Sequence, residues 1–256
     1  MDKAHYIIFH PDKSRQAIDA RATAIENGQV HTTWEGKICV DCINNGNEDP
    51  FVFSDPWLYS YCHATQLRRT PREDGIFLQK DSVIFFVSGD CANKRHLTID
   101  TVFVIENALT WTKKPKLALP IKFQGINQDS PLWKRHLKFP FCGQHASVTH
   151  TYEARHYTNQ DTEVEAPFSF LPIAKNGNRV TIPFSELTTE LVAKINKKIR
   201  GKYPVLLSCD EMQQIYQLIE TEAVTKVIGN ISCDLKPIDM EGSKRKKCGT
   251  WTIPDR

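Results

Sequence analysis

The sequence contains no long apolar run, no strong excess of one charge and no dense set of cysteines. Its longest apolar run, VIFFV at residues 83–87, is far shorter than the ~20 residues of a membrane-spanning helix. The first residues, MDKAHYIIFHPDKSR, also lack the apolar segment of a secretory signal peptide. We therefore expect a cytoplasmic protein without a membrane partner.

The charges and the cysteines argue against further classes of protein. The net charge is +3, from 33 Lys and Arg against 30 Asp and Glu, which does not by itself indicate a nucleic-acid binder. The eight cysteines are scattered, as expected for reduced thiols. Cys39 and Cys42 have the spacing of zinc ligands, and Cys142 with His145 could complete a site. Residues three apart on a strand face opposite sides of the sheet, so we predict that these cysteines bind no metal. We also expect no cofactor.

The first third of the chain alternates strand and helix patterns. Residues 6–9 predict a short strand. Residues 14–26 place Ala and Ile side chains at helical spacing and predict a helix that ends at Asn27-Gly28. Residues 30–34 and 37–43 then predict a strand pair that turns at Glu35-Gly36.

The later segments predict an antiparallel pair, one more strand and two helices. The pair comprises QKDSVIFFVSGD and LTIDTVFVIENALTW, and residues 148–156 predict the additional strand. Residues 185–199 and 210–227 predict helices, and Ser208 with Glu211 has the capping-box spacing. The sequence thus predicts an α+β protein, with a β-rich domain at residues 1–160 and a helical C-terminal extension with a basic tail at residues 161–256.

Two motifs resemble a known superfamily. The segments DPFVFSDPWLYSYCHATQLRR and KDSVIFFVSGD are similar to PUA-like domains, which include the EVE, ASCH and YTH domains. They resemble more closely the second nucleotide-modification-associated domain family, with Ser60, Lys80 and the Ser-Gly-Asp turn as departures from its pattern. The resemblance covers roughly residues 5–110. It implies a PUA-like curved β-barrel that recognises a modified base in a DNA-modification setting.

The aromatic segment provides the chemistry that such recognition needs. A nucleobase requires rings for stacking, polar groups for its edge and cations for phosphate. We therefore expect a nucleotide-binding pocket in which Ser88 belongs to the Ser-Gly turn of the resemblance. Its other residues are Phe53, Asp55, Trp57, Tyr59, Tyr61, Arg68, Arg69, Lys94 and Arg95. The alternative is that these rings fill a β core.

A basic segment lies between Trp111 and Pro140. It carries seven Lys or Arg and a single acid, interleaved with aromatic residues. Phosphate neutralisation beside stacking rings is the expected pattern for a nucleic-acid backbone contact, here at Lys113, Lys114, Lys134 and Arg135. The alternative is a solvated surface. The expected partner is nucleic acid or a free nucleotide.

Two competing functions remain. His63-Ala64-Thr65 and His145-Ala146-Ser147 resemble the paired motifs of two-histidine phosphoesterases, in which one imidazole is the base and the other the acid. Short His-x-Ser/Thr patterns recur by chance in a chain with nine histidines. The third possibility is a protein-interaction domain of a modification or defence complex. A binding module is preferred over an enzyme, because no strong catalytic spacing is present.

Overall fold

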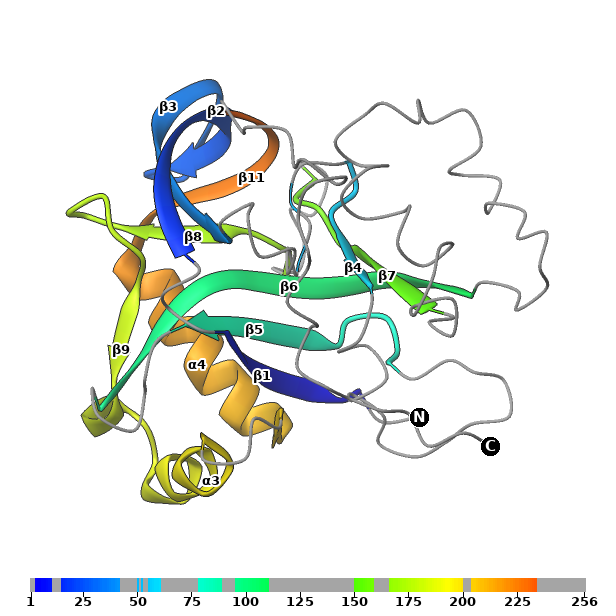
Figure 1. Ribbon diagram of the computed structural model, residues 1–256, viewed down its shortest axis with the longest axis vertical. Coiled ribbons are helices and arrows are strands. Elements are labelled where there is room, and N and C mark those ends of the chain that lie inside the picture. Colours follow the sequence, from blue (N-terminus) through cyan, green and yellow to red (C-terminus); the bar gives the residue numbers. More distant parts are fainter. Residues whose placement is uncertain are drawn as a thin grey trace, which may run out of the picture.

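The computed structural model describes residues 3–10, 15–41, 50, 52, 55–60, 78–88, 95–110, 150–158, 166–199 and 204–233. Its elements are β1 (His5–His10), β2 (Arg15–Glu26), β3 (Gln29–Asp41), β4 (Leu58–Ser60), β5 (Val83–Ser88), β6 (His96–Thr110), β7 (His150–Ala154), β8 (Leu171–Ala174), β9 (Thr181–Pro183), the short 3-10 helix η6 (Phe184–Glu186), α3 (Thr189–Ile199), β10 (Val205–Leu207), α4 (Cys209–Glu222) and β11 (Ala223–Cys233). This part of the chain is mixed α and β, mostly sheet with two α-helices, so the α+β expectation is confirmed (Figure 1).

The strands form two sheets. The larger sheet has the order β10-β1-β5-β6-β7-β4, with β9 also paired to β6, and contains seven strands. The smaller sheet has four strands in the order β3-β2-β11-β8. A bridge between Val102 and Phe170 connects β6 to the residue just before β8. Within the described residues, both sheets are open at their ends and form no closed barrel, so the PUA-like curved β-barrel that the resemblance implies is not confirmed.

Burial on both faces of β5 organises the layers. All six of its residues are buried, in agreement with the apolar character of the run VIFFV. Ile84 and Phe86 point into a core cluster shared with the four-stranded sheet. Val83 and Phe85 alternate to the opposite face and join a second cluster that the helices complete. The larger sheet therefore lies between the smaller sheet and the two helices.

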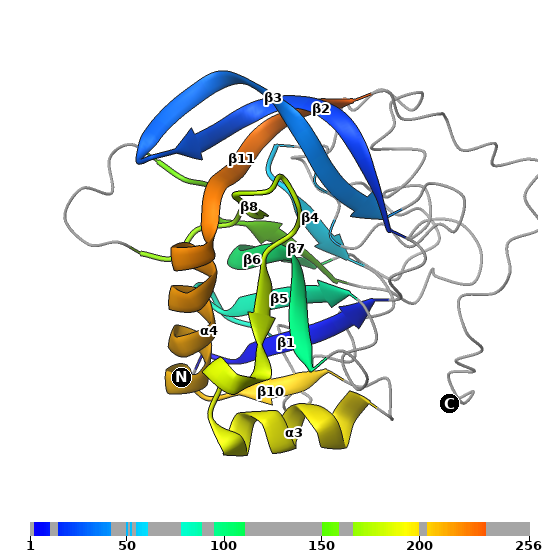
Figure 2. The same cartoon turned by 90° about the vertical axis from the view of Figure 1, so that its left-hand side faces the viewer.

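The helices cover one face of the larger sheet, and Figure 2 shows α4 and α3 lying near β1, β10 and β9. Leu191 and Ile195 of α3 and Ile215 and Ile219 of α4 are completely buried. The expected capping box at Ser208 is present, with the Glu211 N–H donating to Ser208 Oγ at 3.2 Å. None of the described helices has the length and apolar character needed to cross a membrane.

The C-terminal third supplies strands as well as helices. Helix α4 ends at Glu222, earlier than the expected residue 227, because the chain continues directly into β11. Strand β10 pairs with β1, and β11 pairs with β2. Residues beyond 160 therefore belong to both sheets and are not only a helical extension packed on a β-rich domain.

The predicted early helix is wrong, because residues 15–26 form strand β2. Ala20 and Ala22 are buried and alternate with exposed Arg21, which is the period of a strand. Asn27 and Gly28 have φ values of 49° and 75°, as a two-residue hairpin between Glu26 and Gln29 requires. The Asn-Gly pair therefore marks a β-hairpin and not a helix end.

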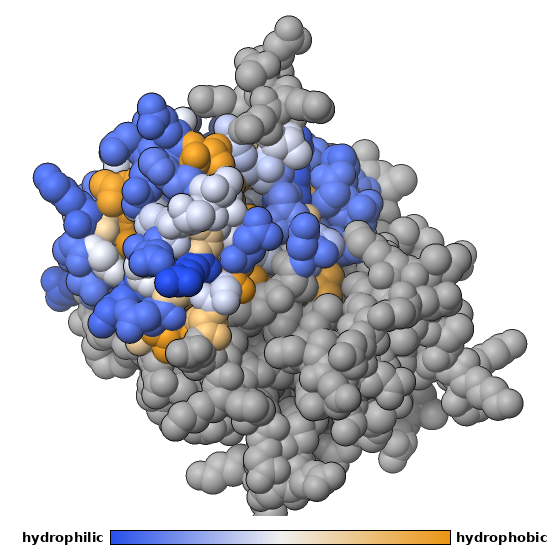
Figure 3. All heavy atoms as spheres, turned by 90° about the horizontal axis from the view of Figure 1, so that it is seen from above, coloured by the Kyte–Doolittle hydropathy of each residue, from blue (hydrophilic) through white to orange (hydrophobic). Residues whose placement is uncertain are grey.

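The expected turn at Glu35-Gly36 is also wrong, because β3 runs through it without interruption. The Trp34 ring lies over Gly36, where an added Cβ would come within 2.3 Å of Trp34 Cζ2. The Trp34 Nε1–H donates to Glu26 Oε1 at 3.0 Å and holds the ring there. Gly36 thus provides space for an indole. Figure 3 shows that the described surface at this end of the molecule is mostly hydrophilic.

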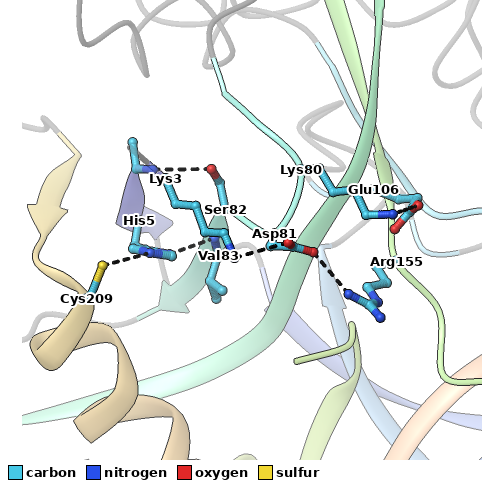
Figure 4. Close-up of polar contacts among 10 residues, drawn as sticks. Lys3, His5, Lys80, Asp81, Ser82, Val83, Glu106, Arg155 and Cys209 are labelled. Carbon is cyan, nitrogen blue, oxygen red and sulfur yellow. Dashed lines mark hydrogen bonds and ion pairs between the residues drawn. The ribbon is translucent and has the colours of Figure 1, made fainter. Parts of the chain in front are cut away.

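A buried histidine connects β1, β5 and α4 (Figure 4). His5 is 1% exposed, and its Nδ1 accepts a hydrogen bond from the Val83 N–H at 3.0 Å. Its Nε2 faces Cys209 Sγ, the first residue of α4, at 3.9 Å. Burial, together with the charge of Lys3, lowers the pKa of His5 from 6.5 to about 4. His5 is therefore neutral in the folded protein near pH 7.

Replacing Gly36 by Ala should lower the free energy of unfolding by about 1–3 kcal/mol, because the methyl group must displace the Trp34 ring. Urea titration followed by tryptophan fluorescence measures the change. Gly229→Ala in β11 is the matched control, since its Cβ would meet nothing within 4 Å, and the change should stay within about 0.5 kcal/mol. Equal losses in both variants would contradict this packing.

The His5 pKa predicts a loss of stability in mild acid. The unfolded chain binds this proton near pH 6.5 and the folded chain only near pH 4, so the unfolded state binds more protons in between. Stability should therefore be complete above pH 6.5 and fall as the pH decreases to about 4, by an amount of the order of 3 kcal/mol.

Urea titrations at several pH values measure this dependence for the wild type and for His5→Asn. The Asn side chain keeps an acceptor but does not titrate. The unfolding free energy of the variant should depend less on pH between 4 and 6.5, while both proteins share every other titrating group. An identical pH dependence in the two proteins would refute the assignment to His5.

Candidate functional site

Two of the expected pocket rings belong to the core. Trp57 and Tyr59 are 0% exposed, so neither presents a face to solvent. The Tyr59 ring packs edge-on against Phe86 at a centroid distance of 5.0 Å and stacks on Tyr152 at 6.2 Å. Strand β4 holds it there by pairing Tyr59 with Tyr152 of β7. The expectation that these two rings form an open stacking wall is therefore corrected, and they act as core residues.

The remaining described residues of the expected pocket are far apart. Asp55 is exposed beside Trp57, in the segment that lies near the Glu106 end of β6. Arg95 lies just before the first residue of β6, at the opposite end of this strand. The eleven residue-to-residue steps from Arg95 to Glu106 correspond to roughly 35 Å of chain at about 3.3 Å per residue. Ser88 pairs with Thr98, near the Arg95 end. The structure therefore does not bring Ser88 and Arg95 together with the aromatic segment.

Ser88 has a structural environment. It is 1% exposed, and its hydroxyl donates to Asp100 Oδ1 at 2.9 Å. Arg179 also donates to Asp100 Oδ1 at 2.8 Å and contacts the Ser88 hydroxyl. The Asp100 side chain is 0% exposed, and a buried carboxylate requires such partners. This cluster ties the turn between β8 and β9 to the larger sheet.

Most other expected site residues lie outside the described residues. These are Phe53, Tyr61, Arg68, Arg69 and Lys94 of the pocket, His63, Thr65, His145 and Ser147 of the phosphoesterase alternative, and Lys113, Lys114, Lys134 and Arg135 of the basic segment. Of the cysteines considered as zinc ligands, Cys39 is half-buried in β3, and Cys42 and Cys142 also lie outside the described part.

A cavity of about 340 Å³ lies next to the aromatic segment. Pro56 of that segment forms part of its wall, together with Lys80 before β5, Glu106 and Asn107 near the end of β6, and residues 153–156 and 158 at and after the end of β7. Cavities that bind small molecules have volumes of about 300–1,000 Å³. The size and the polar lining make this cavity the candidate site.

Three charged residues of the cavity wall, Lys80, Glu106 and Arg155, form ion pairs (Figure 4). Lys80 pairs with Glu106, and both side chains are partly exposed. Arg155 donates to Asp81 Oδ1 at 3.0 Å, and Lys3 lies 3.1 Å from the other oxygen of the same carboxylate. Burial alone would raise the pKa of Asp81, but its hydrogen bonds and the charges of Lys3 and Arg155 outweigh it and lower the pKa. The rim cations therefore face carboxylates.

An acid–amide pair belongs to the wall of the cavity, and its acid is buried whereas its amide is exposed. Glu153 is only 2% exposed, and it pairs across the sheet with Asn107 of β6. The Asn107 Nδ2–H donates to Glu153 Oε2 at 3.2 Å. Tyr152 and Ala154, the neighbours of Glu153, belong to the core cluster, so Glu153 alternates to the other side of β7. This alternation places the Glu153 side chain on the cavity side of β7, where it is covered by its neighbours.

His156 connects the cavity to the aromatic segment. Its Nε2 accepts from the Trp57 backbone N–H at 3.2 Å, and its Nδ1 lies 3.4 Å from the Ile228 carbonyl oxygen. A neutral ring with its proton on Nδ1 satisfies both contacts. Asp55 Oδ1 lies 3.4 Å from Nε2, and the Trp57 ring packs edge-on at 5.9 Å. Trp57 therefore packs against His156 and helps to hold this lining residue in place.

Sequence reasoning missed the residues that form this cavity, although it located the neighbouring segment. Glu153 carries a usable pattern, since the strand HTYEA places an acid between two core-facing positions. Asn107 and Glu106 interrupt the apolar pattern of β6 in the same way. Their meeting depends on the pairing of β6 with β7, whose strands are separated by about 40 residues in the chain.

Comparison of the chain with protein-family models, with curated proteins and with solved structures gives no match.

Proposed function

We propose that this protein is a binding module that recognises a nucleobase or nucleotide in the cavity beside the Asp55–Trp57 segment. The observation that carries this proposal is the cavity of about 340 Å³, whose lining mixes hydrogen-bond donors and acceptors. The edge of a base is itself a short row of donors and acceptors, so a complementary site needs both kinds of group. Asn107, Glu106 and Arg155 provide them.

The position of the cavity agrees with the resemblance in the sequence. The segment DPWLYS is part of the motif that resembles nucleotide-modification-associated domains, and Pro56 of this segment lines the cavity. Base recognition here does not use Trp57 and Tyr59 for stacking, since both are buried. His156 is the ring that lines the cavity among the described residues, and imidazoles also stack on bases.

A ligand panel tests this function. Bases, nucleosides, nucleotides with and without methylation, and short oligonucleotides are added to the full chain, and thermal unfolding and titration calorimetry are measured. At least one probe should bind with saturable heat and raise the unfolding midpoint, since a ligand at 100 times its Kd stabilises by about 2.7 kcal/mol. Mass spectrometry of small molecules that co-purify with the protein extends the panel.

A cavity-blocking variant shows where the probe binds. Thr158 lines the cavity and is exposed, so Thr158→Trp should fill the opening and weaken binding at least tenfold without loss of folding. Thr32→Trp, on the exposed part of β3, is the matched control and should bind as the wild type does. The absence of binding by every probe, or binding unaffected by Thr158→Trp, would refute this function.

A further inference from the structure

We propose that two copies of this chain associate through the free edge of β3, by antiparallel pairing of the two strands about Gly36. This inference does not depend on the proposed function, since β3 contributes none of the described residues that line the cavity. It follows from three features of the strand: its position at a sheet edge, the order of its side chains from Trp34 to Ile38, and the charges on its exposed face.

The first feature is the free edge. Among the described strands, β3 pairs only with β2, and it is the end strand of the four-stranded sheet. It is 13 residues long and contains no proline. An edge of this kind presents backbone N–H and C=O groups with which another strand can pair. Figure 2 shows the β2–β3 hairpin at the top of the molecule, at the end opposite to α3. A partner strand here would extend the smaller sheet.

The second feature is the order of the side chains in the segment Trp34-Glu35-Gly36-Lys37-Ile38. Outward from Gly36, each direction gives first a charged residue and then a large apolar one, and the two charges are opposite. A two-fold axis at Gly36 therefore places Glu35 of each copy opposite Lys37 of the other. The same axis places Trp34 opposite Ile38. The segment is thus complementary to itself.

The third feature is the distribution of charge on the exposed face. Glu35 pairs with Arg21 of β2 at 2.8 Å, and both side chains are exposed. Lys37 is also exposed and lies opposite Asp19 in the register, but it forms no ion pair with a described residue. Pairing about Gly36 completes a row of alternating charge across four strands, in the order Arg21, Glu35, Lys37 of the second copy and Asp19 of the second copy. Opposite charges at such cross-strand positions are stabilising.

The charges also select this register from its neighbours. A pairing centred on Glu35 or on Lys37 would place that side chain opposite its own copy, and like charges directly opposite each other are destabilising. At Gly36 no side chain lies on the axis. The Trp34 ring covers Gly36, so the two indoles of the pair would lie over the two central glycines and bury additional apolar surface.

Sedimentation velocity of the full chain over a concentration series tests the association. The wild type should change from monomer to dimer as the chain concentration rises to about 0.1 mM, a range in which even a weak complex is populated. Added salt should shift the transition to higher concentration, because exposed charge pairs are screened. A wild type that stays monomeric throughout would overturn the proposal and leave the edge to solvent or to a strand of another protein.

Two charge reversals test the register. In Glu35→Lys two lysines face each other at both contacts that the two-fold axis relates, and in Lys37→Glu two acids do so. Each variant alone should therefore dimerise at least tenfold more weakly than the wild type. Far-UV circular dichroism confirms that each variant is folded.

An equimolar mixture of the two variants distinguishes this pairing from a general effect of charge. One copy then carries two lysines at these positions and the other carries two acids, so both contacts again join opposite charges. The mixture should form a heterodimer with an affinity within about threefold of the wild-type dimer. Isotope labelling of one variant allows native mass spectrometry to separate the heterodimer from either homodimer.

Lys197→Glu is the matched control. Lys197 is exposed on α3, at the other end of the molecule, and its replacement changes the charge as Lys37→Glu does. This variant should dimerise as the wild type does. Equal weakening by Lys197→Glu, wild-type dimerisation of either charge reversal, or a mixture that gives no heterodimer would each overturn the proposal.

Discussion

The architecture depends on the burial of one strand on both faces. Every side chain of β5 is buried, and adjacent residues enter two different core clusters. A strand of this kind needs an apolar layer on each side. The four-stranded sheet provides one layer, and α3 and α4 provide the other. The position of each remaining element follows from the need to cover these two faces.

The burial of β5 on both faces also explains why the rings of the aromatic segment do not form an exposed stacking surface. Tyr59 and Trp57 join the cluster between the sheets, where Phe86 of β5 also points. Their rings fill this layer, and the polar groups that pack against the segment, such as His156, are held in place by it. The cavity lies where Glu106 and Asn107 follow the buried run of β6 and where the chain leaves β7. The core thus positions the candidate site without contributing its rings to the lining.

The sequence correctly predicted the elements whose residue pattern fits only one kind of secondary structure. The VIFFV run, the capping box at Ser208 and the strand before Arg155 all matched the structure. The helix predicted at residues 14–26 was wrong, because alanine fits both helical and strand spacing and the Asn-Gly turn decides between them. The turn predicted at Glu35-Gly36 was wrong, because that glycine accommodates an indole ring. Local patterns could not resolve either case.

The candidate site was harder to predict because its parts come from distant segments. The sequence located the stretch around Pro56, but Glu153 and Asn107 acquire meaning only through the register between β6 and β7. Strand order is set by the packing of whole layers, which periodicity does not encode. The resemblance to nucleotide-modification-associated domains could point to the segment and not to its polar neighbours.

The pairing of β10 with β1 and of β11 with β2 has a consequence for how the molecule is made. During synthesis the ribosome releases residues 5–26 long before residues 205–233, so β1 and β2, whose other partners β5 and β3 emerge earlier, each lack their second partner until then. Until then the alanine-rich face of β2 and an edge of β1 stay accessible to chaperones or to aggregation. Folding of this chain is consequently a late event, completed only after its final described strand has emerged.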